Sequence, residues 1–299
     1  MCSSGVADCP PRPVMLFQRL AISGEHMDLR GVIELHVHAG PDVRPRKMDA
    51  LTLVRTARAA GMRALLLKSH DTITADLAQI VEAAVGGIRV FGAVTLNEAV
   101  GGFNPSAVKA ALALGVREVF MPTFSAAHHR RQDRRDGGLT VLDGAGRMRN
   151  EVRQILDLVA QADAILGTSH LAPEESLALV RAARQAGVHK VLVSHPEISF
   201  LAIPLDIQRA MAAEGAYFER MHLHGNSCVD WAGLAAVMRA VGADRTVLVT
   251  DLGRPDAVDP VAGMQEMLEE LEKQGFSRAE LDRMARQTPA RLLNLDDEA

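Results

Sequence analysis

Two histidines separated by a single residue, His36 and His38, end the first apolar run of the sequence and are its clearest candidates for chemistry. In a β-strand, residues i and i+2 point to the same face, so both imidazoles can bind one metal ion. Three later apolar runs end in His170, His195 and Asp251. Imidazole and carboxylate groups are good ligands for Zn²⁺, with Mn²⁺ or Fe²⁺ as alternatives. The set therefore predicts a divalent metal site.

Each histidine also has a structural interpretation. A single histidine at a strand end is more often a hydrogen-bonded structural residue than a ligand, and only the recurrence around several strand ends favours a metal site. The second apolar run also ends in polar residues at i and i+2, Lys68 and His70, which makes His70 a further ligand or a substrate contact. His189 begins a run and should lie at the opposite end of the strands. His128 and His129 could reach the site from a long loop, but we expect them to be exposed to solvent.

A scaffold that gathers strand ends on one face would bring these residues together, and the sequence repeats a suitable unit. A short apolar run of β type, followed by an amphipathic helical stretch, recurs along the chain. The apolar runs are Gly31–His38, Met62–His70, Ile88–Asn97, Val116–Thr123, Ala164–His170, Lys190–His195, Ala216–His222 and Thr246–Asp251. The helical stretches are Leu51–Ala60, Ala75–Ala84, Ser106–Leu114, Val152–Ala160, Glu174–Ala186, Leu205–Ala213, Ala232–Val241, Val261–Lys273 and Arg278–Leu293.

This repeat favours one fold class. Continuous Val, Ile and Leu strands alternating with helices indicate a parallel sheet that is covered on both faces. Eight such units suit a closed (β/α)8 TIM barrel, a single α/β domain, better than an open doubly wound sheet, which stays as the alternative. No glycine-rich nucleotide-binding motif follows the first strand, which counts against the open sheet. In a barrel, the polar strand ends all lie on the face where active sites form.

Two segments depart from the repeat. The stretch from Phe124 to Arg149, between the fourth strand and its helix, is long for a connection, and its second half, Leu139–Met148, could form a small hairpin. Long loops on a compact scaffold are usually functional, so we interpret the stretch as an insertion and a candidate lid. Residues 1–30, which contain a cluster of prolines, are interpreted as an N-terminal extension, and residues 31–299 as the barrel domain.

Composition and charge narrow the classes of function. The net charge is −4 and the one short arginine cluster lacks interleaved aromatic residues, so we expect no nucleic-acid partner. Three scattered cysteines are too few for a disulfide framework. No apolar run approaches the roughly 18 residues of a membrane span, and no signal-peptide pattern opens the chain. These features predict a cytoplasmic protein with a small-molecule substrate and no membrane partner.

The ordered set of polar strand ends resembles the amidohydrolase superfamily. Its hallmark is His-x-His on strand one, histidines on strands five and six, and aspartate on strand eight. Those positions are matched in order by His36, His38, His170, His195 and Asp251. The segment 288–293 is also similar to the Asn-Pro-Ala-Arg-x-Leu segment that closes many members. The resemblance runs from about Gly31 to Leu295 and implies a metal-dependent hydrolase with one or two ions, most typically Zn²⁺. Homo-oligomers are common in the superfamily.

One position departs from the superfamily pattern. A lysine or acidic residue that bridges two metals usually comes from strand four, yet no Lys, Glu or Asp stands at the carboxyl end of the fourth run. Lys68, at the end of the second run, is the lysine at a strand end on that face. Lys68 is therefore a candidate metal ligand, carboxylated if it bridges two ions. The alternatives are that its ammonium group binds substrate or that the site holds one metal.

The resemblance also implies a reaction and its residues. A bound ion would lower the pKa of water toward neutrality, Asp251 would move the proton to the leaving group, and His195 or a metal would polarise the scissile carbonyl. The expected substrate is a small molecule with an amide, cyclic imide, lactone or ester bond. A decarboxylase or lyase, a phosphoesterase and a barrel without catalysis are the alternatives. Four further residues near strand ends are candidate substrate contacts: Arg44, Arg220, Arg254 and His222.

Overall fold

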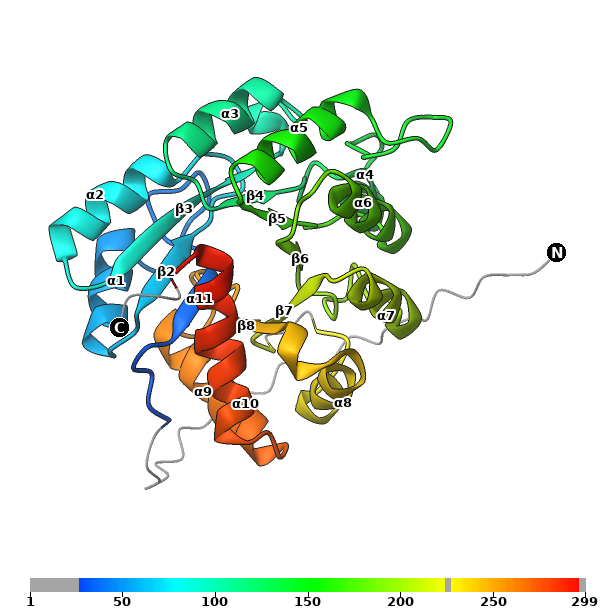
Figure 1. Ribbon diagram of the computed structural model, residues 1–299. Helices are drawn as coiled ribbons and strands as arrows, with labels where there is room; N and C mark the ends of the chain where they lie inside the picture. Colours follow the sequence, from blue (N-terminus) through cyan, green and yellow to red (C-terminus); the bar gives the residue numbers. More distant parts are fainter. Residues whose placement is uncertain (1–26, 224–226, 296–299) are drawn as a thin grey trace.

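The computed structural model describes residues 27–223 and 227–295. Eight parallel strands form one sheet in the order β1 to β8, so each strand pairs with its neighbour in sequence. Their bounds are β1 Ile33–Val37, β2 Ala64–Leu67, β3 Arg89–Thr95, β4 Glu118–Phe120, β5 Ile165–Gly167, β6 Val191–Val193, β7 Tyr217–Met221 and β8 Thr246–Val249. Every strand lies within an apolar run that the sequence predicts, and the predicted (β/α)8 barrel is confirmed (Figure 1).

Helices cover the outside of the sheet, as Figure 1 shows. Their bounds are α1 Ala50–Ala59, α2 Ala75–Val85, α3 Pro105–Ala113, α4 Ala127–Gln132, α5 Asn150–Gln161, α6 Pro173–Gln185, α7 Leu205–Ala213, α8 Trp231–Val241, α9 Pro260–Lys273, α10 Arg278–Asp282 and α11 Thr288–Leu293. Between α10 and α11 the chain makes a π-helical turn over Arg283–Gln287, where the sequence predicts one uninterrupted helix. Short 3₁₀ turns over Glu98–Val100 and Ala243–Arg245 complete the regular structure.

Local sequence explains where several helices begin. Asp49 precedes α1 and its side chain accepts a hydrogen bond from the backbone N–H of Thr52. Asp259 caps α9 in the same way, and Pro260 follows it at the first helical position, where a missing N–H costs nothing. The apolar faces of α1 and α9 pack with strand β2 in one buried cluster, which includes Leu53, Leu67 and Met264. These contacts fix the strands, and thereby the strand ends.

The barrel closes between its last strand and its first. The backbone N–H of Asp251 donates to the carbonyl of His36 over 2.9 Å, and the N–H of His38 donates to the carbonyl of Leu252, also over 2.9 Å. The buried carboxylate of Glu34 accepts bonds from the N–H groups of Thr250 and His36, each at 2.9 Å. Because these bonds join candidate ligands directly, the closing seam of the barrel also sets the distance between them.

The segment between β4 and α5 has structure of its own. It contains helix α4, and an isolated antiparallel bridge pairs Leu142 with Met148 inside the stretch where the sequence predicts a hairpin. Backbone bonds of 2.9 Å and 2.7 Å tie Leu139 to Ala127 and Ser125, so the segment folds back on itself. Of the predicted extension, residues 1–26 lie outside the described part of the chain.

The described helices also bear on the question of a membrane span. No helix in residues 27–223 or 227–295 combines the length and apolar character that crossing a membrane requires.

The seam provides a test of the fold. Gly253 has φ +135°, and a Cβ added there would lie 2.1 Å from the carbonyl oxygen of His38. We expect Gly253→Ala to lower the free energy of unfolding by on the order of 2–4 kcal/mol. Alanine at this positive φ is strained, and its Cβ would clash with the backbone of His38. Chemical denaturation measures the change. Gly144→Ala is the control, since nothing lies within 4 Å of its added Cβ; equal stability of the two variants would refute the prediction.

Candidate metal centre

Three predicted ligands meet at the carboxyl ends of β1 and β8. The Oδ1 atom of Asp251 lies 3.0 Å from Nε2 of His36 and 3.2 Å from Nε2 of His38. One ligand atom from each of the three side chains lies within 4.8 Å of the other two. Both histidines are buried, and the Asp251 side chain is 15% exposed, which leaves an approach from solvent. The spacing and the donor types fit a divalent cation.

Hydrogen bonds orient both rings of the pair on β1. Nδ1 of His36 lies 3.1 Å from Oε2 of Glu219, and Nδ1 of His38 lies 2.8 Å from the backbone carbonyl of Lys68. Carboxylate and carbonyl oxygens only accept, so each Nδ1 carries the proton and donates it. Each Nε2, which faces Asp251, is then the nitrogen available to a metal. Such partners behind histidine ligands are typical of metal sites, and they support the fit.

Backbone conformation is unusual at three strand ends around this cluster. Ser169, His195 and Asp251 all have positive φ, at 54°, 29° and 51°. Left-handed conformation in residues other than glycine costs about 1–3 kcal/mol each, and such positions concentrate at functional sites. The last two are predicted ligands, so the strain falls where the side chains must point into the barrel mouth. Besides the cluster of ligand atoms, the location of this backbone strain is a second indication of a functional site.

The other two predicted histidines lie beside the cluster. The ring centre of His195 is 5.7 Å from that of His36 and 5.2 Å from that of His170. Nδ1 of His195 is buried and has no hydrogen-bond partner among the described residues. A buried imidazole nitrogen without a partner fits a ligand better than a structural residue. His170 differs, because its Nδ1 lies 2.9 Å from Nδ1 of His129.

His70 faces the same space from the end of β2. Its ring stacks on that of His38 with centres 4.8 Å apart, and its Nδ1 lies 2.9 Å from the hydroxyl of Thr123. Asn97 fixes this hydroxyl by donating to it over 2.6 Å and also donates to the backbone carbonyl of His70 over 2.9 Å. The ring of His70 is therefore held at both its backbone and its Nδ1 edge.

A buried layer of ionisable side chains lies inside the barrel beside the cluster. Nζ of Lys68 is 2.9 Å from Nε2 of His36 and 4.4 Å from the ring centre of Phe120. Glu118 on β4 and Glu219 on β7 are fully buried and interact electrostatically with Lys68. Both oxygens of Glu118 lack a hydrogen-bond partner in the described part of the chain. Lys68 thus contacts His36 of the cluster, and its role as a metal ligand stays a prediction.

The pKa values follow from burial and from the carboxylates. Burial lowers the pKa of His36, but Asp251 and Glu219 outweigh it and raise the value to about 9. Burial lowers the pKa of His38 to about 3 and that of His195 to about 4. Burial raises the pKa of Asp251, yet His36 holds it well below its usual range. In the absence of metal, a proton on His36 supplies the positive charge that the carboxylates require, and metal binding would release it.

The predicted substrate contacts separate into two groups. Arg44 lies at the mouth, where its guanidinium is 4.1 Å from the ring centre of Phe124, and Phe124 packs against His70. Arg220 is not brought to the site. Neighbouring residues of a strand face opposite ways, so Glu219 points into the barrel while Arg220 points outward and contacts Glu197 and Gln208.

Arg254 and His222 are also engaged away from the cluster. Arg254 is 54% exposed and pairs with Asp256 over 2.7 Å. Nε2 of His222 lies 3.2 Å from a carboxylate oxygen of Glu266 on α9. Arg44 is linked to the His36–His38–Asp251 group through Phe124 and His70, whose ring stacks on that of His38.

Sequence reasoning missed several residues of the site. Glu118 and Glu219 gave a signal, since a charged residue inside an otherwise apolar strand must be paired or functional when buried. His129 was expected in solvent, but it is 6% exposed and packs on His170. Phe124 and Phe200 line the mouth beside His170, with ring centres 5.7 Å and 4.7 Å from it. Nothing local in the sequence marks these aromatic residues.

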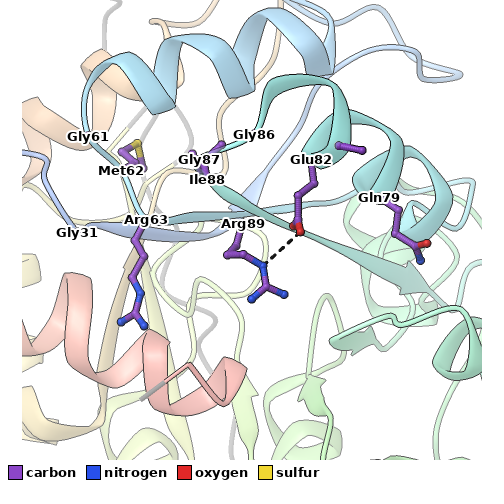
Figure 2. Close-up of a pocket in the computed structure, with 11 residues that line it drawn as sticks. Gly31, Gly61, Met62, Arg63, Gln79, Glu82, Gly86, Gly87, Ile88 and Arg89 are labelled. Atoms are coloured by element: carbon purple, nitrogen blue, oxygen red, sulfur yellow. Dashed lines mark ion pairs between the residues drawn. The ribbon is translucent and has the colours of Figure 1, made fainter. Parts of the chain in front are cut away.

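A separate pocket opens at the other end of the barrel. It has a volume of about 740 Å³ and lies where β2 and β3 begin, lined by Arg63, Glu82 and Arg89 among others (Figure 2). Glu82 pairs with Arg89 over 3.3 Å. Because active sites of parallel barrels form at the opposite face, this pocket is not the catalytic site.

Comparison with known proteins places the fold in context. A family of unknown function, DUF6282, matches residues 31–219. No curated protein matches the sequence. Solved structures that share the barrel fold include an amidohydrolase, an organophosphorus hydrolase and an engineered protein. An amidohydrolase from Pseudomonas aeruginosa is 14% identical over 88% of this chain and 95% of its own, with a TM-score of 0.61.

The other two structures are an organophosphorus hydrolase and an engineered protein. The organophosphorus hydrolase from Deinococcus radiodurans is 15% identical over 91% of this chain and 100% of its own, with a TM-score of 0.58. A protein engineered for organophosphate hydrolysis from a weak promiscuous lactonase is 16% identical over 89% and 96%, with a TM-score of 0.60. At these identities the likeness establishes the shared barrel fold.

Metal binding can be tested without a substrate. We expect Zn²⁺ at a hundredfold excess over its Kd to stabilise the folded protein by about 2.7 kcal/mol, measured as a rise in melting temperature. Asp251→Asn and His38→Ala should lose most of this shift, because each removes a ligand atom of the cluster. His189→Ala, outside the cluster, should keep it. A shift that survives loss of Asp251 and His38 would place the ion elsewhere.

Proposed function

Because the chain belongs to the family of unknown function DUF6282 and has the barrel fold of the amidohydrolase superfamily, we propose that it is a metal-dependent hydrolase of small molecules. The observation that carries the proposal is the convergence of His36, His38 and Asp251, with both Nε2 atoms directed at the carboxylate. His195, with its buried and unpartnered Nδ1, and His170 supply further ligand atoms to the same centre. Zn²⁺ is the ion that suits such donors best.

Lys68 decides how many ions the centre holds. An ammonium group offers no lone pair, so Lys68 can ligate a metal only after carboxylation. Burial lowers the pKa of Lys68, although Asp251, Glu219 and Glu118 oppose that shift, and a lowered pKa favours the neutral amine that carboxylation needs. An unmodified Lys68 leaves a centre with one ion, and a carboxylated Lys68 allows two. The mass of the intact native protein distinguishes the two forms.

The chain's own residues account for proton transfer. A bound divalent ion would supply Lewis acidity that acidifies water and polarises the scissile bond. Asp251 accepts the proton of the attacking water at its carboxylate and delivers it to the leaving group. His36 and His38, held by Glu219 and the Lys68 carbonyl, keep their Nε2 atoms turned toward Asp251 throughout. Fixed partners of this kind need no reorganisation during the reaction.

His70 is assigned as a hydrogen-bond donor to the substrate. The Thr123 hydroxyl accepts from Asn97, and its own proton needs an acceptor; within the described chain, Nδ1 of His70 is the atom in reach. The proton of His70 then resides on Nε2. Burial lowers the pKa of His70 well below its usual range, so the ring stays neutral. A neutral imidazole N–H can stabilise negative charge on a substrate oxygen, which makes His70 a substrate contact and not a ligand.

The mouth suits a small substrate with an apolar part and an anionic group. Phe124 and Phe200 provide apolar faces, and Arg44 provides a half-exposed guanidinium that also pairs with Asp71 over 3.4 Å. One structural neighbour was engineered from a lactonase and another is an organophosphorus hydrolase, which supports testing a panel of lactones, esters, amides, cyclic imides and phosphoesters.

The reaction class can be tested with water labelled with ¹⁸O. Hydrolysis in this water puts the labelled oxygen in the product. Release of CO₂ without label would instead identify a decarboxylase.

Asp251 is the residue that tests the mechanism. On the best substrate of that panel, Asp251→Asn should lower kcat by at least about 10²- to 10⁴-fold, because the substitution removes the general acid–base group and also a ligand atom of the ion. Circular dichroism should show an intact fold, since the backbone bond from Asp251 to His36 remains. Undiminished turnover in this variant would refute the proton-transfer role.

The assignment of His70 can be tested with two substitutions. His70→Phe keeps a ring stacked on His38 but removes the N–H, and we expect kcat to fall by about 10²- to 10³-fold, as for loss of an oxyanion donor. His70→Gln retains an N–H donor and should recover part of this loss. Steady-state kinetics measure both, and Zn²⁺ affinity should change little in either variant. A large fall in Zn²⁺ affinity would instead mark His70 as a ligand.

A further inference from the structure

Helix α4 brings a buried histidine against a candidate ligand. Nδ1 of His129 lies 2.9 Å from Nδ1 of His170, and the two rings stack with centres 4.7 Å apart. Phe124 and Phe200 pack edge-on against His129 at 4.9 Å and 4.7 Å. These contacts exclude solvent from the pair, so the hydrogen bond between the two rings is buried.

The position of one carboxylate favours one direction of this hydrogen bond. When both imidazoles are neutral, one Nδ1 donates and the other accepts. Nε2 of His129 lies 3.5 Å from Oδ2 of Asp133, one helical turn away. A carboxylate only accepts, so it favours the proton of His129 on Nε2 and leaves Nδ1 of His129 as the acceptor. His170 must then carry its proton on Nδ1, and its Nε2 keeps a lone pair.

Helix α4 is anchored on both sides, which holds His129 in place. Arg130 pairs with Glu98, after β3, over 2.6 Å. Nε2 of His128 lies 2.7 Å from the backbone carbonyl of Phe200, after β6. The N–H of Ala127 donates to the carbonyl of Leu139 over 2.9 Å. In this arrangement the segment forms a wall of the site, and its role as a lid stays a prediction.

We propose that His129 is a positioning residue of the metal centre: together with Asp133 it holds His170 in the tautomer whose Nε2 can bind the ion. The inference rests on the metal centre of the proposed function, and it extends that centre to the segment between β4 and α5. It parallels the way in which Glu219 and the Lys68 carbonyl hold His36 and His38. Partners of this kind behind histidine ligands set both ring orientation and basicity.

The tautomer can be measured directly in the metal-free protein. Nitrogen NMR of the full chain, with His170 assigned by substitution, should show its proton on Nδ1. In His129→Leu this preference should disappear, because Nδ1 loses its acceptor. In His129→Asn it should return, because the amide oxygen stands near the place of Nδ1 and accepts a hydrogen bond. A proton on Nε2 of His170 in the unsubstituted protein overturns the proposal.

Zn²⁺ affinity provides the second measurement. Competition against a chromophoric chelator should show a loss of about 10- to 100-fold for His129→Leu, the usual cost of removing such a partner, and a smaller loss for His129→Asn. Arg131→Ala, on the exposed side of α4, is the matched control and should bind as the unsubstituted protein does. Equal affinity of His129→Leu and the control would overturn the proposal.

These outcomes are independent of the reaction. A protein without hydrolytic activity that still shows the Nδ1 tautomer and the loss of affinity would contradict the proposed function and leave the role of His129 in place. If the protein hydrolyses a substrate but His129→Leu leaves the tautomer of His170 and the Zn²⁺ affinity unchanged, the proposed function stands and the role of His129 is refuted.

Discussion

The joint between β8 and β1 is the constraint on which the rest of the structure depends. The bond from the Asp251 N–H to the His36 carbonyl closes the barrel, and the side chains of the same two residues meet 3.0 Å apart at its mouth. The hydrogen bonds that close the barrel therefore also fix the distance between the two ligand side chains. The left-handed backbone at Asp251 is tolerated because the closed sheet determines it from both sides.

Much of this arrangement could be predicted from the sequence, because it depends on periodicity. Apolar runs separated by amphipathic helices specify eight parallel strands, and the barrel then places every carboxyl end on one face. His36 and His38 share a face through the two-residue repeat of a strand, and Asp251 follows the last apolar run. The order of the strands and helices was therefore enough to predict that these three side chains lie close together. The ligand roles of His170 and His195 remain predictions.

What could not be predicted depends on contacts between distant segments. His129 lies in a segment without periodicity, and only the packing of α4 on Phe124 and Phe200 buries it. Arg220 was expected just after the seventh strand, but it lies within β7, whose register turns it outward and gives the inner position to Glu219. The protonated nitrogen of each imidazole is set by a partner such as Thr123, which lies far along the chain.

The anchoring of α4 has a consequence for how substrates would be selected. Contacts tie this wall to the residues after β3 and β6, and Phe124 and Phe200 pack on it. Under the proposed function, an incoming molecule would be selected by its fit to Phe124, Phe200 and Arg44. Exchanging these three side chains would then change specificity while the contacts made by Arg130 and by Nε2 of His128 stay in place.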